Sequence, residues 1–284
     1  MEHPLFEIVT TTTGAVSIRN KDVNEIMHNP VGPWLEANAL YIDQSRLRER
    51  IARHEDGELV LFDVGLGAAA NALAVLHCAR GLPFPKRPLH LVSFERDLDL
   101  LKFALAHADS FEHFKGYETI LETLLCEGRW SEPGLTWELR HGNFTELIEQ
   151  EPTRAHVVLF DPYSPQVNRE MWSTDCFRKV RAKSRDESEG GTLLYTYSQA
   201  TPIRVALLVA GFYVGQGTAT GLKEETTQAA TCVKDLPSPL GSRWLERWKR
   251  SGAPYPFECA VDQQDQIKTL ILEHPQFSES VLRS

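Results

Sequence analysis

A short polar and aromatic segment, Asp161–Pro165 (DPYSP), directly follows the apolar run Ala155–Phe160. Proline fixes the backbone φ angle, so the two prolines stiffen this segment and hold a carboxylate beside an aromatic ring. A carboxylate in that place can accept a hydrogen bond from an amine, orient it and take a proton from it. Burial of the amine against Tyr163 and Trp172 would favour its neutral, nucleophilic form. The alternative is a rigid turn in which Tyr163 serves only for packing.

A turn with two glycines, Gly65 and Gly67, lies between the apolar run Leu59–Asp63 and the alanine-rich segment Ala68–Arg80. Glycine at a strand-to-helix turn lets the backbone approach a ligand closely. In an open parallel sheet, ligands bind beyond the carboxyl ends of the strands, where this turn would lie. Asp63 would then lie near a positively charged group of a cofactor. The same turn also occurs in α/β proteins for purely structural reasons.

An acidic residue, Glu95, ends the next apolar run, Leu89–Glu95, where it could hold the hydroxyls of a ribose. A nicotinamide enzyme has an acidic residue in a similar place, together with a third glycine close to the pyrophosphate. The stretch 67–71 (GAAAN) lacks that glycine. S-adenosylmethionine contains no pyrophosphate, and we therefore expect it as the cofactor in preference to a dinucleotide.

Short apolar runs alternate with helical segments through the middle of the chain. The runs are Leu59–Asp63, Leu89–Glu95, Leu135–Arg140, Ala155–Phe160 and Thr192–Tyr197, and the helical segments include Ala68–Arg80, Leu98–Ala108 and Pro202–Ala210. This alternation predicts the α/β class, with a mostly parallel sheet covered by helices on both faces. The nearly continuous apolar character of the runs agrees with burial on both sides.

The two ends of the chain differ from this middle part. Residues Phe6–Ile18 are rich in β-branched side chains around Gly14, which predicts two short strands and a turn. Two short helices are expected near the other end, at Arg243–Arg250 and Asp262–Glu273. We therefore expect an N-terminal extension (1–45), a core (46–235) and a C-terminal tail (236–284).

The composition is that of a globular protein. The chain has 284 residues, 42% hydrophobic and 24% charged, with a formal net charge of −9. Its five cysteines form no CxxC pair, so neither a disulfide framework nor a metal site is expected. No apolar run is long enough to span a bilayer, and the first residues do not resemble a signal peptide. We expect a cytoplasmic protein without membrane contact.

Several motifs together resemble the methyltransferase domain of the MnmC family, which modifies the wobble uridine of tRNA. The most specific is the pattern D-x-Y-x-P-x-x-N-x-x-M-W from Asp161 to Trp172, similar to the family's D-x-F-x-P-x-x-N-P-x-M-W. Residues 65–71 (GLGAAAN) are similar to its G-x-G-T-G-x-N, and 93–95 (SFE) to its S-x-E. The resemblance covers roughly residues 24–230.

This resemblance implies a class I methyltransferase, Rossmann-like, that uses S-adenosylmethionine. The implied acceptor is the 5-aminomethyl group of the wobble uridine in the anticodon loop of tRNA. We expect no counterpart of the family's FAD oxidase domain here, so a separate FAD-dependent oxidase or aminomethyl-forming enzymes would be functional partners. Carried over to this sequence, the catalytic residues are Asp161 and Tyr163, the cofactor-binding residues are Asp63, Gly65, Gly67, Asn71, Glu95, Asn143 and Asp161, and the substrate-binding residues are His28, Glu36, Pro165, Asn168, Trp172 and Lys223.

Two departures from the family pattern keep other functions open. Ala69 replaces a glycine and adds a methyl group at the expected cofactor site, and Asn143 replaces an aspartate. One alternative is a methyltransferase of a small amine or a protein side chain. Another is a relative that binds cofactor or RNA without catalysis.

A net charge of −9 repels polyanions, so tRNA binding would need a local group of cations. Two segments have the required charge, 178–185 (RKVRAKSR) and 243–250 (RWLERWKR). Either could instead be an ordinary solvated helix face. The target uridine would have to leave the anticodon stack, and Tyr163 and Trp172 offer rings against which it could lie.

Overall fold

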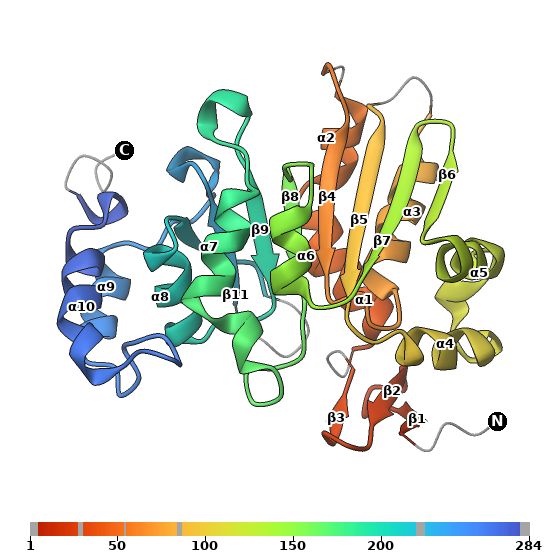
Figure 1. Cartoon of the computed structure of the whole chain (residues 1–284), viewed down its shortest axis with the longest axis horizontal. Helices are drawn as coiled ribbons and strands as arrows, with labels where there is room; N and C mark the ends of the chain where they lie inside the picture. The colour runs from red at the N-terminus through yellow and green to blue at the C-terminus, as the bar shows by residue number, and fades with distance from the viewer. Residues whose placement is uncertain (1–4, 28–30, 54, 84–86, 220–224, 279–284) are drawn as a thin grey trace.

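The structure, a computed structural model, describes residues 5–27, 31–53, 55–83, 87–219 and 225–278. Within this part of the chain, eight strands form a central sheet in the order β10-β11-β9-β8-β4-β5-β7-β6 (Figure 1). Their bounds are β4 Leu59–Val64, β5 Leu89–Glu95, β6 Arg129–Glu132, β7 Leu135–His141, β8 Val157–Phe160, β9 Leu193–Thr196, β10 Tyr213–Gly217 and β11 Thr226–Ala230.

The middle of this sheet is parallel. Strand β4 pairs in parallel with both β5 and β8, β5 pairs with β7, and β8 pairs with β9. Antiparallel pairs occur only toward the edges, where β6 joins β7 and where β11 lies between β9 and β10. The expected α/β fold is therefore confirmed, and the carboxyl ends of β4, β5 and β8 lie together.

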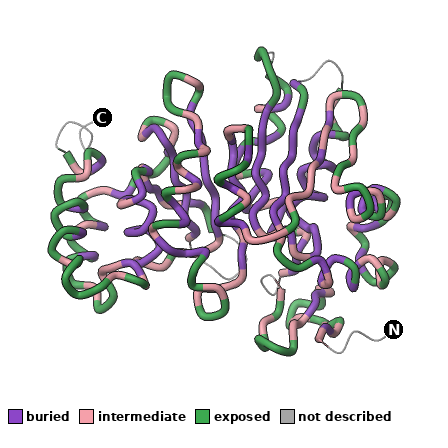
Figure 2. Tube along the Cα trace, viewed as in Figure 1, coloured by how far each residue is buried: buried purple, intermediate pink, exposed green. Residues whose placement is uncertain are grey.

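Two hydrophobic cores lie on opposite faces of the sheet. In β4, Leu59 and Leu61 belong to one core, and Val60, Phe62 and Val64 belong to the other. The first core contains side chains from α1 Pro33–Ala37, a π-helix Asn38–Asp43, α2 Leu47–Ala52, α3 Ala70–Arg80, α4 Asp99–Ala106 and α5 Glu118–Glu127. The second contains side chains from α6 Phe144–Gln150, α7 Thr174–Ala182, α8 Thr201–Val209, α9 Ser242–Lys249 and α10 Gln264–Leu272. Figure 2 shows the central strands buried between these layers.

Short 3-10 helices connect several of these elements. They are Ala108–Ser110, Glu112–Phe114, Arg169–Trp172, Glu187–Glu189, Val233–Asp235, Val261–Gln263 and Pro275–Phe277. None of the described helices is both long and apolar enough to cross a membrane.

A small antiparallel sheet precedes the central one. Its strands are β1 Phe6–Thr10, β2 Val16–Asn20 and β3 Glu25–Ile26, and the expected turn lies at Gly14, whose φ is +87°. The ring of Phe6 packs on Phe103 of α4 with centroids 5.7 Å apart. In Figure 1 this sheet lies near α1 and α4, off one end of the central strands. The two strands expected in this segment are confirmed, whereas β3 was not predicted.

The ends of the chain contribute to the two cores. Tyr41 and Leu47, near the first predicted boundary, belong to the first core, while Trp244 and Ile271 belong to the second. The helices expected near residues 243–250 and 262–273 are observed as α9 and α10. The division into a core and two extensions remains a prediction.

Candidate functional site

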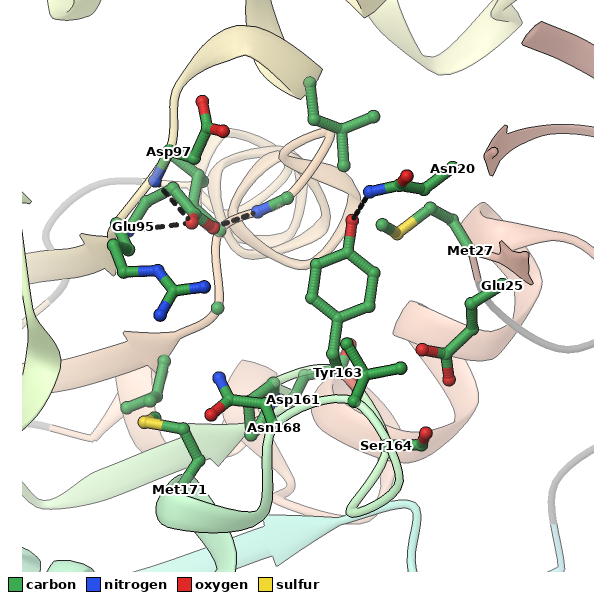
Figure 3. A pocket seen from close by; sticks show the side chains of 18 of the residues that line it. Asn20, Glu25, Met27, Glu95, Asp97, Asp161, Tyr163, Ser164, Asn168 and Met171 are labelled. Carbon is green, nitrogen blue, oxygen red and sulfur yellow. Dashed lines mark hydrogen bonds between the residues drawn. The ribbon is translucent and has the colours of Figure 1, made fainter. Parts of the chain in front are cut away.

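A cavity of about 480 Å³ lies between the carboxyl ends of β4, β5 and β8 and the small N-terminal sheet. Its wall combines the glycine turn after β4, the end of β5, the segment after β8 and the strands β2 and β3. Figure 3 shows Glu95 and Asp97 on one side of the cavity, Glu25 on the opposite side and the ring of Tyr163 between them. We call the part around Gly65, Gly67 and Glu95 the glycine half, and the part around Glu25, Glu36 and Asp161 the carboxylate half.

The glycine turn needs glycine for its backbone shape and for close contact. Gly65 has φ +89°, and a Cβ atom there would lie 2.7 Å from the carbonyl oxygen of Asp161 and 3.0 Å from Cα of Pro162. Gly67 has φ +54°, and its N–H donates a hydrogen bond of 2.9 Å to Oε2 of Glu95. The turn is thus packed directly against the segment that follows β8.

Glu95 organises the loop at the end of β5. Its Oε1 accepts hydrogen bonds from the backbone N–H groups of Arg96 and Asp97, at 2.7 and 3.0 Å. Burial raises the pKa of Glu95, although these bonds and the one from Gly67 oppose the rise. A carboxylate oxygen has two lone pairs, so Oε2, which accepts only the bond from Gly67, retains capacity to accept from a ribose hydroxyl.

Two predicted cofactor-binding residues lie behind the cavity wall. Asp63 is fully buried and accepts a 2.7 Å hydrogen bond from Ser93 Oγ, which in turn accepts one from the indole of Trp137. Burial raises the pKa of Asp63 to about 7, and the charges of Asp161 and Glu95 add to the rise, while the Ser93 bond opposes it. Asn71, 3% exposed, donates a 2.7 Å hydrogen bond to Oδ2 of Asp161. Neither side chain lines the cavity; Asn71 positions Asp161 from behind.

Ala69 does not add a methyl group to the cavity, contrary to the expectation from the sequence. It adopts φ +62° as the residue before α3, is fully buried and does not line the cavity. Its methyl group therefore lies outside the cavity space, and the cost of this residue is backbone strain, since left-handed φ values are unfavourable for L-residues. The positive φ also explains why α3 begins at Ala70, two residues after the predicted start.

Side-chain hydrogen bonds to Pro162 and Tyr163 also hold the segment after β8. The hydroxyl of Tyr197 donates to the carbonyl of Pro162 at 3.0 Å, and the indole of Trp172 donates to the carbonyl of Tyr163 at 2.8 Å. The hydroxyl of Tyr163 accepts a bond of 3.2 Å from Asn20 of β2, which links the segment to the N-terminal sheet. Asp161 and Tyr163 both line the cavity, whereas Trp172 is fully buried beneath the segment and supports it from the core.

Of the other predicted site residues, some line the cavity and others do not. Glu36, Asn143 and Asn168 line the cavity, and Pro165 does not. Asn143 also caps α6 by accepting a hydrogen bond from the N–H of Thr145. His28 and Lys223 lie outside the described residues. Asn168 is also the N-cap residue of the 3-10 helix Arg169–Trp172, but its side chain makes no cap hydrogen bond to that helix.

Sequence reasoning missed Asn20, Glu25 and Tyr197, which also line the cavity. Asn20 and Glu25 lie in a segment for which no motif was found. The position of Tyr197 at the end of β9 is a signal that could have been used, because this strand ends at the same sheet edge as β4 and β8.

The cavity wall is strongly acidic. The carboxylates lining it are Glu25, Glu36, Glu95, Asp97, Asp161 and Glu170, and Arg96 is the single basic side chain among the described residues that line it. Negative charge around a cavity attracts positively charged ligands. A sulfonium and an alkylammonium both fit this wall, whereas a phosphate group would be repelled.

The first predicted RNA-binding segment, 178–185, lies elsewhere. It occupies the last part of α7 and the residues directly after that helix, and Ser184 pairs with Ala155 next to the amino end of β8, the edge opposite the cavity. Lys179 forms an ion pair with Glu149 at 3.0 Å, and Arg181 forms one with Asp186 at 2.9 Å. Its charges are therefore partly neutralised and face away from the site.

The second segment, 243–250, lies on α9, whose Trp244 and Trp248 are buried in the second core. Its cations do not line the cavity, and Lys249 pairs with Glu246 at 2.7 Å. Neither segment supplies a cationic wall to the site.

Comparisons with known proteins agree with this geometry. Residues 118–232 match a family model described as S-adenosyl-L-methionine-dependent methyltransferase. The solved structure of MnmC2 from Aquifex aeolicus has the same fold, with a TM-score of 0.70 and 22% identity over 94% of this chain and 84% of that one. The fold is thus that of the class I methyltransferases, and the family match over residues 118–232 indicates a methyltransferase that uses S-adenosylmethionine.

Relatives in sequence indicate the family more closely. The tRNA 5-methylaminomethyl-2-thiouridine biosynthesis bifunctional protein MnmC of Campylobacter concisus is 27% identical over 82% of this chain and 37% of that protein. The protein of the same name from Burkholderia vietnamiensis is 28% identical over 67% of this chain and 30% of its own length. The chain is therefore related to the methyltransferase part of MnmC, and it spans about a third of the length of these relatives.

Proposed function

We propose that the protein methylates an amine, namely the 5-aminomethyl group of the wobble uridine in the anticodon loop of tRNA. The observation that carries the proposal is the position of Asp161. It lines an acidic cavity next to the glycine turn, and Asn71 holds it from behind at 2.7 Å. A carboxylate held in this way suits an amine as the methyl acceptor better than a hydroxyl group or a carbon atom. The reason is that an alkylammonium is both a hydrogen-bond donor and a cation.

Glu95 and the backbone around Gly65 and Gly67 would hold the cofactor. S-adenosylmethionine supplies a methyl group on a positively charged sulfur, which leaves as a neutral thioether. The bound cofactor would supply an electrophilic methyl carbon, to which the amine nitrogen would give its lone pair as the carbon–sulfur bond broke. Before that, the ammonium has to lose a proton, and Asp161 would accept it. Alignment of the amine and the methyl group, together with exclusion of water, would provide much of the rate enhancement.

The identity of the acceptor rests on sequence relatives. The proteins named MnmC that this chain resembles are described as acting in tRNA 5-methylaminomethyl-2-thiouridine biosynthesis. If this chain has that substrate, it works in the cytoplasm, and a separate FAD-dependent oxidase or other aminomethyl-forming enzymes have to produce its acceptor.

Methyl transfer to defined RNA tests the proposal. An anticodon stem-loop carrying 5-aminomethyluridine at the wobble position is incubated with the protein and methyl-labelled S-adenosylmethionine, next to the same stem-loop with unmodified uridine. Label is expected only on the aminomethyl RNA. If cofactor binds but neither RNA becomes labelled, the proposed acceptor is wrong.

A second candidate is a small amine or a protein amine as acceptor. The acidic cavity and the ion-paired cations of segment 178–185 favour it, because neither helps to bind a polyanion. Methylation of free 5-aminomethyluridine or of simple alkylamines at rates equal to the stem-loop would support it. A relative without catalysis would show no transfer to any of these acceptors.

A further inference from the structure

Three carboxylates reach the same end of the cavity from separate parts of the chain. Glu25 comes from β3 of the small sheet, Glu36 from α1 and Asp161 from the segment after β8. The hydroxyl-bearing side chain of Tyr197 lines the cavity as well. Burial, followed by the negative charges of Asp161, Glu25 and Glu36, raises the pKa of Tyr197 above its usual value. The charges of all three carboxylates thus raise the pKa of the same tyrosine.

One acceptor atom at this end has no donor among the described residues. It is Oε2 of Glu25, which is buried. Buried carboxylate oxygens without a donor are costly, because desolvation is not compensated. What is missing beside Glu25 is a hydrogen-bond donor, and a positively charged one fits best.

A buried tyrosine lies behind this end of the cavity. Tyr41, in the π-helix, is 1% exposed and does not line the cavity. Burial raises the pKa of Tyr41, and the charges of Asp161 and Glu36 and a hydrogen bond with Asp161 raise it further. The negative charge of these carboxylates thus acts on the cavity and on the core behind it.

We propose that Glu25, together with Glu36 and Asp161, forms a subsite that binds the acceptor as an alkylammonium ion. An ammonium group carries three N–H donors and one positive charge, which matches several carboxylates that line one cavity. This assignment deepens the proposed function, on which it rests, by naming Glu25 as the residue that determines specificity for a charged amine.

The residues next to Glu25 indicate what the ammonium is attached to. Val23 and Ile26, which are 37% and 38% exposed, line the cavity on either side of Glu25, and Val167 lines it at 38% exposure. Large apolar side chains at the mouth of a cavity favour contact with a flat, weakly polar group. The subsite thus fits an aminomethyl group on a planar ring, with the ring at the mouth and the nitrogen inside.

The charge balance of the step follows from this arrangement. The ammonium ion binds first, because the carboxylates stabilise its charge. One proton then passes to a carboxylate, which becomes neutral, and the resulting amine attacks the methyl group. The product is again a cation after the new nitrogen–carbon bond forms, and the subsite balances its charge until it leaves.

Binding of a charged and a neutral analogue tests the subsite without any turnover. The protein is saturated with S-adenosylhomocysteine and titrated in a calorimeter with 5-aminomethyluridine and, separately, with 5-hydroxymethyluridine. The wild type is expected to bind the amine at least about ten-fold more tightly, as for hydrogen bonds that involve charged groups. Glu25→Gln should lose most of this preference.

Asp22→Asn serves as the matched control. Asp22 lies in the turn directly before β3, is exposed and does not line the cavity. This variant should keep the preference of the wild type. Unchanged affinity for S-adenosylhomocysteine would show that each variant is folded at the site.

Two results would overturn the inference. Equal binding of the two nucleosides by the wild type would mean that there is no ammonium subsite. An undiminished preference in Glu25→Gln would mean that Glu25 is not part of it. Failure of the RNA methylation assay, with the ammonium preference intact, would instead reject the proposed tRNA acceptor and leave the subsite in place.

Discussion

The two halves of the cavity are assembled in different ways. The glycine half uses residues at the ends of two adjacent parallel strands, β4 and β5, and a local hydrogen bond from Gly67 to Glu95 closes it. The carboxylate half brings together β3, α1 and the segment after β8, which are more than a hundred residues apart at the extremes. In the proposed function, cofactor binding would thus depend on local turns, whereas acceptor binding would depend on tertiary packing.

Gly65 joins the two halves, so its substitution should have the largest effect. A Cβ atom at this position would lie 2.7 Å from the carbonyl oxygen of Asp161 and push the turn away from the catalytic segment. Gly65→Ala is expected to lower the free energy of unfolding by roughly 2–4 kcal/mol and to reduce methyl transfer at least about 100-fold. Denaturant titration and single-turnover assays measure the two effects.

Gly116→Ala provides the control for this comparison. Gly116 has a similar φ of +82°, but a Cβ atom there would meet nothing within 4 Å. The control should therefore lose only about 1 kcal/mol of stability and no activity. Equal losses in the two variants would show that backbone strain, and not contact with the Asp161 segment, is the reason for glycine at position 65.

Asp161→Asn should separate the functions of the two halves. The amide keeps an oxygen that can accept from Asn71 but cannot take a proton, so kcat should fall about 100-fold or more. The dissociation constant of S-adenosylmethionine should change less than about three-fold, because Glu95 and the glycine turn are unaltered. Glu170→Gln, at another carboxylate of the wall, should retain activity. A large loss of cofactor affinity in Asp161→Asn would contradict the separation.

A smaller effect is expected from Asp63, which supports the glycine half from behind. Its folded-state pKa of about 7 lies above the ordinary value of 3.8, so the folded protein favours the protonated form. The corresponding stabilisation is complete below about pH 4 and is lost as the pH rises through 7. In Asp63→Asn this loss, roughly 2–4 kcal/mol, should disappear, because the amide does not ionise. Unfolding titrations of both proteins between pH 4 and 8 test this, and parallel curves would contradict it.

The smallest effect is expected from the cations of segment 178–185. Lys179 and Arg181 are paired with acidic residues and lie on α7, away from the cavity. The double variant Lys179→Ala/Arg181→Ala should change the KM for the stem-loop less than about two-fold, since exposed ion pairs contribute little. A ten-fold rise in KM would show that the RNA extends to this edge of the sheet.

The sequence predicted the glycine half better than the carboxylate half. Gly65, Gly67 and Glu95 could be assigned because a turn and a strand end are local features that keep their meaning in any parallel sheet. Asp161 and Tyr163 were found through a dense motif. Glu25 was not found, because β3 has only two residues and pairing with β2 alone brings it to the cavity.

Burial also could not be predicted from residue type. Asp63 and Trp172 had the right chemistry and the right position in the chain, but the structure has both behind the cavity wall. Strand residues alternate between the two faces of a sheet, and which face borders the cavity depends on the packing of distant helices. Ala69 has a backbone φ of +62°, and its methyl group lies outside the cavity.

The most direct test of the account is a crystal structure of the protein with S-adenosylhomocysteine and 5-aminomethyluridine. We predict the adenosine next to Gly65, Gly67 and Glu95, and the amino nitrogen within hydrogen-bond distance of Asp161 and Glu25. A structure with the adenosine outside this cavity, or with the amino group turned toward solvent, would contradict it.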